Sequence, residues 1–342
     1  MHDRIAVIGA GSWGTALAIS FALAGRDVSL WARRPEAAVV MQEERHNPTY
    51  LPDAVIPDSV LVTSNLGEAI EGREIWVIAT PSQQVRSIAE RLQAAADRSR
   101  VVVSVAKGIE NGTLLTTTGV LREVLTSADP TKLAVLYGPS HAEEVASGSP
   151  TAVVVASRDK ETANRLQGLF MSPRLRVYAN DDLIGVEIAG SVKNVLAIAA
   201  GISEGVGYGD NAKAALITRG ISEIRRLGCA MGARATTFSG LAGIGDLVVT
   251  CTSRHSRNRA VGVELGRGRS LEDVVSHMSM VAEGVRTTES VYQLSRRLGV
   301  EMPITEAVYS ILFDLKPPRS AVHDLMNRSA KHEDWLYGAG DC

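Results

Sequence analysis

The sequence predicts an α/β protein in which a doubly wound parallel sheet is followed by an all-α domain. Short apolar runs of strand length alternate with helical patterns through the first half of the chain, and these strand signals stop near residue 183. The chain has 342 residues, about twice the ~150 residues that serve as a guide for one domain. We therefore expect two domains, residues 1–182 and residues 183–342, with a ligand-binding cleft between them.

Six apolar runs predict the strands of the first domain: Ile5–Ile8, Val28–Trp31, Ile75–Ala79, Val101–Val105, Leu133–Tyr137 and Thr151–Ala156. Helical patterns such as Thr15–Ala24 and Gln84–Ala96 lie between most of them. Alternation of this kind specifies a mostly parallel sheet with right-handed crossovers. The composition agrees, because 45% hydrophobic residues with only 4% aromatic ones favour cores of Val, Ile, Leu and Ala, as in buried parallel sheets.

The second half of the chain reads as long helices broken at the glycine-rich loops 201–209 and 240–245. Its longest apolar stretch, Leu183–Gly201, contains Glu187 and Lys193. A membrane-spanning helix needs ~20 residues with few or no charges, so we expect a buried helix and no membrane insertion. The polar segment that begins with Pro317-Pro318 is expected to lie over the surface as a tail or to fray.

Charge and cysteine content exclude several classes of protein. A net charge of −2 provides no general attraction to nucleic acid or to an anionic membrane, so any anion must be bound locally. Cys229, Cys251 and Cys342 are odd in number, widely spaced and form no C-x-x-C pair, which argues against a disulfide framework and a zinc site. No metal site is expected. The first strand run starts at Ile5, which leaves no room for a signal segment and favours a cytoplasmic location.

A glycine-rich fingerprint, Gly9-Ala10-Gly11-Ser12-Trp13-Gly14, follows the first predicted strand and opens the first predicted helix. Its three glycines, Gly9, Gly11 and Gly14, would allow a tight turn, close approach to a pyrophosphate, and close packing of helix on strand. The helix amides would then point at the anion. In this context the pattern predicts a Rossmann domain that binds a dinucleotide.

The second predicted strand ends in Trp31-Ala32-Arg33-Arg34, where NAD-binding domains usually carry an acidic residue for the ribose. Two guanidinium groups suit a phosphate instead, so we expect NADP(H) to be preferred and NAD(H) to be possible. The alternative is that Arg33 and Arg34 form a solvated turn.

Ligands of parallel sheets bind at the carboxyl ends of the strands, which gives weight to the turns that follow them. These turns contain Lys107, Thr80-Pro81-Ser82, and Gly138-Pro139-Ser140-His141. We expect a cation and several hydroxyl groups to meet in one crevice. Lys107 is predicted to contact ligand rather than to be an ordinary surface lysine, whereas His141 is predicted to start a helix rather than to carry a proton.

Lys193 is surrounded by apolar residues on every side of the helix 183–201 and is predicted to be buried. Burial disfavours the ammonium form and lowers a lysine pKa, which creates an amine able to accept a proton near neutral pH. The alternative is a structural ion pair with Glu187 or Asp246.

Hydrogen-bond donors are concentrated in Ser253-Arg254-His255-Ser256-Arg257-Asn258-Arg259. Arginine can hold a phosphate through two hydrogen bonds, and a serine and an asparagine beside it can complete a pocket for a small dianion. A solvated, basic start of a helix is the alternative. The stretch lacks the interleaved aromatic residues of a single-stranded nucleic-acid platform.

Taken in order, these motifs resemble the bacterial NAD(P)-dependent glycerol-3-phosphate dehydrogenases. The resemblance rests on the fingerprint, Ala106-Lys107-Gly108, Gly138-Pro139-Ser140, Val192-Lys193-Asn194, Gly243-Ile244-Gly245-Asp246, Ser256-Arg257-Asn258, Glu283-Gly284 and Met302-Pro303-Ile304-Thr305-Glu306. It extends from about residue 4 to about residue 315.

The resemblance implies reversible conversion of sn-glycerol 3-phosphate to dihydroxyacetone phosphate, used to supply glycerophospholipid synthesis. It implies that Lys193 is the proton acceptor. The implied substrate contacts are Lys107, Gly138, Ser140, Lys193, Asp246, Ser256, Arg257 and Asn258. The implied dinucleotide contacts outside the glycines are Ser12, Trp13, Arg33, Arg34, Tyr50, Lys107, Ala142, Arg257, Val281 and Glu283.

Two other readings remain open at this stage. A related NADP-dependent reductase of a hydroxy or oxo acid would join the same two kinds of domain, and turnover of unphosphorylated acids would distinguish it. A non-catalytic NADP-sensing module would be expected to lack the lysines found at positions 107 and 193. The apolar helical domain makes a homodimer plausible.

Overall fold

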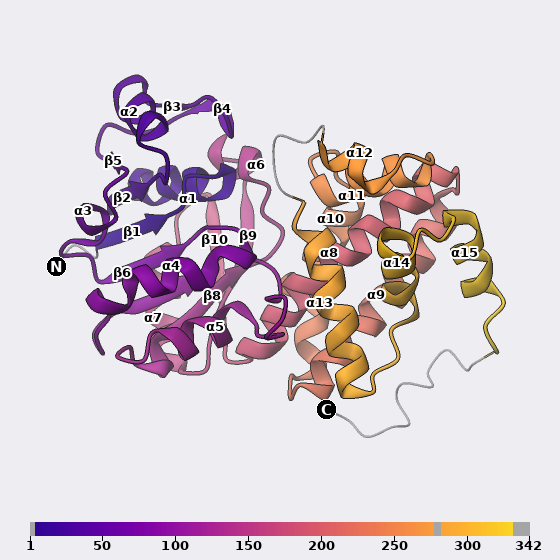
Figure 1. The fold of residues 1–342 in the computed structure, drawn as a ribbon. Helices are drawn as coiled ribbons and strands as arrows, with labels where there is room; N and C mark the ends of the chain where they lie inside the picture. The colour runs from indigo at the N-terminus through magenta and orange to yellow at the C-terminus, as the bar shows by residue number, and fades with distance from the viewer. Residues whose placement is uncertain (1–3, 277–281, 331–342) are drawn as a thin grey trace. The chain divides into compact units, whose positions relative to one another are not determined.

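The computed structural model describes residues 4–276 and 282–330, and the chain forms two compact units (Figure 1). The first unit contains the chain up to Ala106 together with Thr117–Leu183, and the second contains Lys107–Thr116 together with the chain from Ile184. The short segment Lys107–Thr116 therefore belongs to the second unit, although the sequence boundary at residues 182/183 places it in the first.

The first unit is built on an eight-stranded sheet with the order β10-β9-β8-β7-β6-β1-β2-β5. Every neighbouring pair is parallel except β8 and β9, which are antiparallel. The strands are β1 (Arg4–Ile8), β2 (Asp27–Trp31), β5 (Leu61–Thr63), β6 (Ile75–Ile78), β7 (Val101–Ser104), β8 (Leu133–Tyr137), β9 (Thr151–Ser157) and β10 (Leu175–Asn180). A separate antiparallel pair is formed by β3 (His46–Asn47) and β4 (Leu51–Val55).

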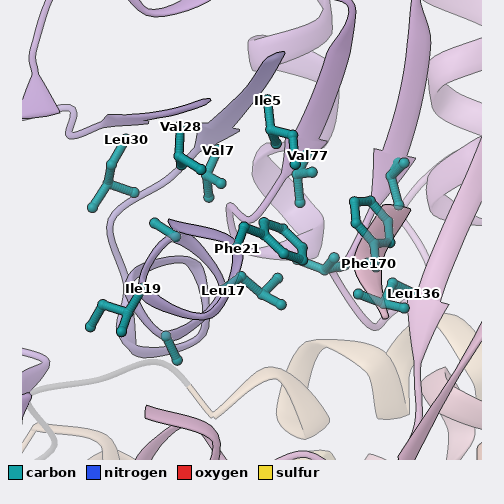
Figure 2. Close-up of a cluster of buried hydrophobic side chains, with 14 of the residues drawn as sticks. Ile5, Val7, Leu17, Ile19, Phe21, Val28, Leu30, Val77, Leu136 and Phe170 are labelled. Atoms are coloured by element: carbon teal, nitrogen blue, oxygen red, sulfur yellow. The ribbon is translucent and has the colours of Figure 1, made fainter. Parts of the chain in front are cut away.

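The helices of the first unit are α1 (Ser12–Leu23), α2 (Pro35–Glu44), α3 (Leu66–Ile70), α4 (Val85–Leu92), α5 (Thr117–Val124), α6 (Ala142–Ala146) and α7 (Lys160–Phe170). Alternate strand residues face one side of the sheet, where Leu17 and Phe21 of α1 and Phe170 of α7 pack against them. Figure 2 shows this cluster with Phe21 and Phe170 side by side, and their rings stack with centroids 4.7 Å apart. The apolar strand residues and these helices thus form one continuous hydrophobic core.

The predicted fold class is confirmed, and all six predicted strands are present. The strands β5, β10 and the β3–β4 pair were not predicted. β10 reads Leu-Arg-Val-Tyr-Ala-Asn and alternates between buried and exposed residues, as a strand at the edge of a sheet does. A search for fully apolar runs therefore overlooks it.

The second unit is helical in its described part. Its helices are α8 (Leu183–Val206), α9 (Asp210–Ala230), α10 (Asp246–Thr252), α11 (Arg257–Gly266), α12 (Leu271–Ser276), α13 (Glu283–Leu298), α14 (Pro303–Phe313) and α15 (Pro318–Met326). Helix α8 is long and apolar enough to cross a membrane by length and composition, but 94% of its apolar window is buried inside the structure. We therefore identify α8 as the core helix of this unit.

Helix α8 and helix α11 approach each other closely through glycines. A Cβ atom on Gly201 would lie 2.0 Å from the carbonyl oxygen of Arg259, and one on Gly262 would lie 2.1 Å from that of Ile198. The prediction of a glycine-rich loop that starts at Gly201 is wrong, since α8 continues to Val206. Gly201 and Gly205 are required by helix packing, whereas Gly207, with a φ of +98°, lies in the turn that follows α8.

The second predicted glycine loop is a tight turn. Residues 241–245 form a single π-helical turn in which Gly243 is not helical, and a Cβ atom there would lie 2.1 Å from the Phe238 carbonyl oxygen. This turn leads directly into α10 at Asp246.

One further expectation needs correction. The start of the predicted tail does not simply drape or fray, because Pro318–Met326 form α15, with Pro318 in its first turn, where a missing N–H has no cost. Residues 331–342 of the predicted tail lie outside the described residues. Of the cysteines, Cys251 is a buried free thiol.

Candidate active site

The fingerprint loop of the first unit has the geometry of a dinucleotide cradle. Gly9 has a φ of +123°, and a Cβ atom on Gly14 would lie 1.9 Å from the Gly9 carbonyl oxygen. A Cβ atom on Gly11 would meet nothing within 4 Å, so the loop is open on that side. Helix α1 starts at Ser12, and its first amides have no intrahelical acceptor, which suits a pyrophosphate.

The loop lies at the carboxyl ends of β1 and β6, where the strand order changes direction. Two polar atoms are buried there without a hydrogen-bond partner in the described chain: Nε1 of Trp13 and Oγ1 of Thr80. Buried polar groups are normally satisfied, so these atoms point to a bound group that supplies the partner. The residues of the first unit therefore fit a dinucleotide.

Asn47 ties the β3–β4 pair to the fingerprint loop and was not identified from the sequence. Asn47 is 3% exposed, and its side-chain amide donates to the Ala10 carbonyl at 3.0 Å and to the Thr15 hydroxyl at 2.8 Å. The Asn47 side chain also accepts from the Tyr50 amide at 3.2 Å, which places the predicted cofactor residue Tyr50 close to the loop. No local sequence pattern identifies an asparagine that contacts a distant loop in this way.

Arg33 and Arg34 follow the carboxyl end of β2, as the sequence predicts. Both side chains are exposed, and Arg34 is the residue that precedes α2. Neither forms an ion pair within residues 4–276 and 282–330. The two exposed arginines could therefore bind a ligand phosphate, or they could form a solvated turn.

The turn after β8 places Gly138, Ser140 and Ala142 at the same edge of the sheet as the fingerprint loop, because β8 is parallel to β7 and β7 to β6. Gly138 has a φ of +140°, and its carbonyl accepts from the Ser140 hydroxyl at 2.9 Å. His141 is the N-cap residue of α6, as predicted, and Ala142 is its first residue.

In the second unit three charged side chains form one cluster. Lys107 donates to Oδ2 of Asp246 at 2.8 Å, and Lys193 donates to Oδ1 of the same carboxylate. Lys193 also donates to the Thr250 hydroxyl at 2.8 Å, while that hydroxyl donates to the Asp246 carbonyl at 2.5 Å. Lys193 is 6% exposed and Asp246 is 1% exposed. Thr250 is the member that the sequence did not reveal.

Burial and charge set the protonation of this cluster. Burial lowers the pKa of Lys193 to about 8, an effect that Asp246 opposes and the Lys107 ammonium reinforces. Burial acts to raise the pKa of Asp246, but the ammonium groups of Lys107 and Lys193 outweigh it and hold that pKa below its usual value. The cluster thus contains an ionised carboxylate beside an amine that exchanges protons near neutral pH.

The segment that carries Lys107 is fixed to α13. The Ser290 hydroxyl donates to the Ile109 carbonyl at 2.9 Å and also bonds the Asn111 side chain. The Asn111 amide donates to Glu289 at 2.6 Å. We call these contacts of Ile109, Asn111, Glu289 and Ser290 the α13 clasp. The clasp therefore fixes the segment two and four residues after Lys107, at Ile109 and Asn111.

The predicted anion site is the start of α11. The Ser256 hydroxyl caps the helix by accepting from the Arg259 amide at 3.2 Å, and Arg257 is exposed at the first helical position. Glu204 of α8 binds the Arg259 guanidinium through two hydrogen bonds of 3.1 and 2.5 Å, which fixes this first turn. An exposed arginine at a helix N-terminus is a suitable place for a phosphate.

The start of α13 joins the anion site to the lysine cluster. The Gly284 amide donates to Oδ1 of Asn258 at 2.9 Å, and a Cβ atom on Gly284 would lie 2.7 Å from the carbonyl oxygen of Asn194. Asn258 and the Lys193-Asn194 segment therefore meet at this glycine. Glu283 is half-buried beside it, whereas Val281, also predicted to bind the cofactor, lies outside the described residues.

Each half of the chain matches a family model. Residues 4–163 match the NAD-dependent glycerol-3-phosphate dehydrogenase N-terminus, and residues 182–323 match the corresponding C-terminus. The chain belongs to this family.

Relatives in the family are similar over nearly their full length. A glycerol-3-phosphate dehydrogenase [NAD(P)+] of Salinibacter ruber is 60% identical, with 98% of each chain covered. One of Chlorobium luteolum is 55% identical, with 97% of this chain and 99% of the relative covered. The crystal structure of glycerol-3-phosphate dehydrogenase from Coxiella burnetii superposes with a TM-score of 0.91 at 40% identity, covering 96% of this chain and 99% of that one.

Proposed function

We propose that this family member catalyses the reversible, NAD(P)-dependent oxidation of sn-glycerol 3-phosphate to dihydroxyacetone phosphate. The observation that carries the proposal is the buried Lys107–Asp246–Lys193 cluster, which lies in the same unit as the start of α11, our candidate for the phosphate site. The cluster would supply an amine for the proton, and Arg257 of α11 would supply a cation for the phosphate. The family relationship supports the same reaction.

Lys193 is the proton acceptor in this proposal. Its pKa of about 8 leaves part of the population neutral, so Nζ can accept the proton of the C2 hydroxyl group. Asp246 and Thr250 hold Nζ in place and stabilise the ammonium group that forms. Lys107 shares the Asp246 carboxylate and would contact the substrate oxygen or the cofactor. The bound nicotinamide would accept the hydride.

Substrate specificity would come from α11. Ser256, Arg257 and Asn258 surround its first turn, and the helix dipole adds partial positive charge at that end. A phosphate monoester held there would place its three-carbon chain toward the lysine cluster, because Gly284 contacts both segments. Binding the phosphate would therefore orient the reacting carbon. Gly138 and Ser140 of the first unit are proposed as further substrate contacts.

The first unit is proposed to hold the cofactor through Gly9, Gly11, Ser12, Trp13, Gly14 and Ala142, with Tyr50 beside the loop. In the second unit, Lys107, Arg257, Glu283 and Val281 are proposed cofactor contacts. Arg33 and Arg34 favour the 2′-phosphate of NADP. Dissociation constants measured for both cofactors test this preference: the Arg33→Ala/Arg34→Ala variant is expected to bind NADPH about tenfold more weakly or worse and NADH unchanged. Equal affinities in the native protein would overturn it.

The decisive assay follows NADPH consumption with dihydroxyacetone phosphate, in parallel with unphosphorylated dihydroxyacetone and with 2-oxo acids. Rapid turnover of the phosphorylated ketone alone is expected. Turnover of an oxo acid without dihydroxyacetone phosphate activity would replace the proposal with a reductase of oxo acids. NADPH binding without turnover of any substrate would replace it with a sensor function.

The physiological setting proposed for this activity is cytoplasmic supply of glycerol 3-phosphate to glycerophospholipid synthesis. A homodimer is proposed as the assembly. Light scattering of the purified full-length chain tests the dimer, and complementation of a glycerol-auxotrophic bacterial strain tests the supply of glycerol 3-phosphate.

A further inference from the structure

A cavity of about 560 Å³ lies within the helical unit, lined by residues of α8, α9, α14 and α15. None of the lysine-cluster or α11 residues described above contributes to its wall. Its size falls within the range of ~300–1,000 Å³ that is usual for small-molecule sites. The proposed dehydrogenase activity makes no use of it.

The two ends of this cavity differ in chemistry. At one end, the wall is formed by Ala212 and Leu216 from the start of α9 and by Ile311 from the end of α14. These side chains make it an apolar end.

The opposite end collects charged groups. The Arg226 guanidinium donates to the Glu301 carbonyl at 3.0 Å, and Arg328 pairs with the Glu301 carboxylate. Arg219 lies on the cavity-facing side of α9, seven residues before Arg226. No ion pair or hydrogen bond of the Arg219 side chain is found within residues 4–276 and 282–330.

The carboxylates at the charged end do not neutralise the arginines. Glu301 is already paired with Arg328, and Glu223 accepts hydrogen bonds from the Ile304 and Thr305 amides at 2.7 and 3.2 Å. Burial raises the pKa of Glu223 to about 7, so near neutral pH much of it is uncharged. The charged end of the cavity is thus positive on balance, with three arginines against one full carboxylate.

We infer that this cavity binds a single-chain amphiphile with an anionic head, a fatty carboxylate or an alkyl phosphate ester. Its hydrocarbon chain would occupy the apolar end, and its head would bind Arg219 and Arg226. Removal of chain methylenes from water supplies affinity, while the arginines require a negative head. A neutral amphiphile cannot form the charged contact with the arginines, and a small polar anion has no hydrocarbon chain to bury.

The test uses a dansyl-labelled undecanoate with the full-length protein and measures its fluorescence on binding. Decanoate and decyl phosphate are expected to displace the probe. Decanol should displace it only at a concentration about tenfold higher, since one charge-assisted contact is lost. Glycerol phosphate should not displace it. Comparing decanoate with decyl phosphate identifies which head group is preferred. The binding readout is independent of dehydrogenase activity, so either proposal can fail alone.

Two variants locate the site. Arg219→Gln is expected to weaken decanoate binding about tenfold with decanol unaffected, and Ala307→Phe is expected to abolish probe binding by filling the cavity. Arg225→Gln, on the same helix but outside the cavity wall, is the matched control. Thermal melts establish that each variant is folded.

Three results would overturn the inference. Decanol that competes as well as decanoate would show general hydrophobic binding. Unchanged probe binding in both Arg219→Gln and Ala307→Phe would place the probe elsewhere. A dimer that becomes a monomer in Ala307→Phe, with no probe binding to the native protein, would identify the cavity as an interface between copies of this chain.

Discussion

At Lys193, burial and neighbouring charges act on a single ammonium group. Loss of hydration lowers its pKa, Asp246 raises it, and Lys107 lowers it again, with a result of about 8. A lysine that was only an ion-pair partner of Asp246 would be held charged. Because desolvation is the largest influence, the side chain is instead able to exchange a proton in the physiological range.

Replacing Lys193 by alanine should remove the proton acceptor and leave the fold intact. We expect kcat to fall by about 10²–10⁴-fold while the dissociation constant of NADPH stays unchanged. Steady-state kinetics and cofactor fluorescence measure the two quantities. Near-native turnover in the folded variant would exclude this lysine from the chemistry.

The pH dependence of the oxidation direction should report the same group. Lys193 must be neutral to accept a proton, so the rate of glycerol 3-phosphate oxidation should rise with pH and level off above about 8. In the direction of ketone reduction the group must start protonated, so that rate should fall above the same pH. Identical profiles in the two directions would contradict the assignment.

Arg257 should contribute to binding more than to the chemical step. The Arg257→Ala variant is expected to raise KM for dihydroxyacetone phosphate about ten- to a hundredfold with a smaller change in kcat. Arg254→Ala, an exposed arginine three residues earlier, provides the control. An unaltered KM would move the phosphate site away from the start of α11.

The sequence predicted the roles of some site residues but not of others. The burial of Lys193 was predictable because apolar residues surround it within its own helix. Thr250 and Asn47 were not, since their roles depend on partners 57 and 32 residues away. A threonine or asparagine has no local signal that identifies such a partner.

At the scale of elements, the α13 clasp holds the position of Lys107 from outside its own segment. Asn111 and Ile109 are bound to α13, and the Ile109–Thr116 bridge closes the segment into a loop. Lys107 therefore keeps its distance from Asp246 because a different helix fixes the chain next to it.

The Asn111→Ala variant should loosen this segment. We expect kcat/KM to fall about ten- to a hundredfold, since small displacements of catalytic groups are costly. The rise of the oxidation rate should also move to higher pH, because the Lys107 charge that lowers the pKa of Lys193 is less well placed beside Asp246. A shift of the pH profile indicates that Lys107 is misplaced, whereas general destabilisation of the fold would lower the rate without such a shift.

Thr113→Ala is the matched control for this experiment. Its hydroxyl bonds Glu110 within the same segment and does not reach α13. If Thr113→Ala and Asn111→Ala shift the pH profile equally, the clasp has no specific role in placing Lys107.

Elements with continuous apolar runs were predicted correctly, and those whose pattern depends on neighbours were not. The glycines of α8 looked like loop residues because glycine is common in turns. Their actual reason is the close approach of α11, which only the packed structure contains. The same limitation explains the β3–β4 pair, whose residues include polar and exposed positions.

At the scale of the whole molecule, alternation of strand and helix patterns was sufficient to predict the fold class. The assignment of Lys107–Thr116 to the helical unit could not be predicted, since it is decided by contacts of Asn111 and Ser290 that are far apart in the sequence.

Global stability should depend on pH through Glu223. Its pKa is raised from 4.5 to about 7 by burial, so the folded state binds more protons than the unfolded state between these values. The contribution of Glu223 to the free energy of unfolding is therefore fully present below pH 4.5 and is lost as the pH rises through 7. Relative to Glu223→Gln, the native protein should lose up to about 3 kcal/mol of unfolding free energy across this window.

Urea denaturation of the native protein and of Glu223→Gln at the two ends of the window measures this difference. Glu306→Gln, a half-buried glutamate on α14, is the control and should follow the native protein. A native protein that gains stability relative to Glu223→Gln as pH rises would reverse the sign and contradict the assignment.

The path of Lys107–Thr116 limits how this gene can be divided. The backbone passes from one unit to the other at Ala106–Lys107, at Thr116–Thr117 and at Leu183–Ile184. A truncated gene that begins at codon 184 would encode α9–α15 and all of α8 except Leu183, but would leave Asp246 without Lys107 and Ser290 without the Ile109 carbonyl. A chimaera made with one breakpoint at this codon would likewise combine the helices of one parent with the lysine segment of the other.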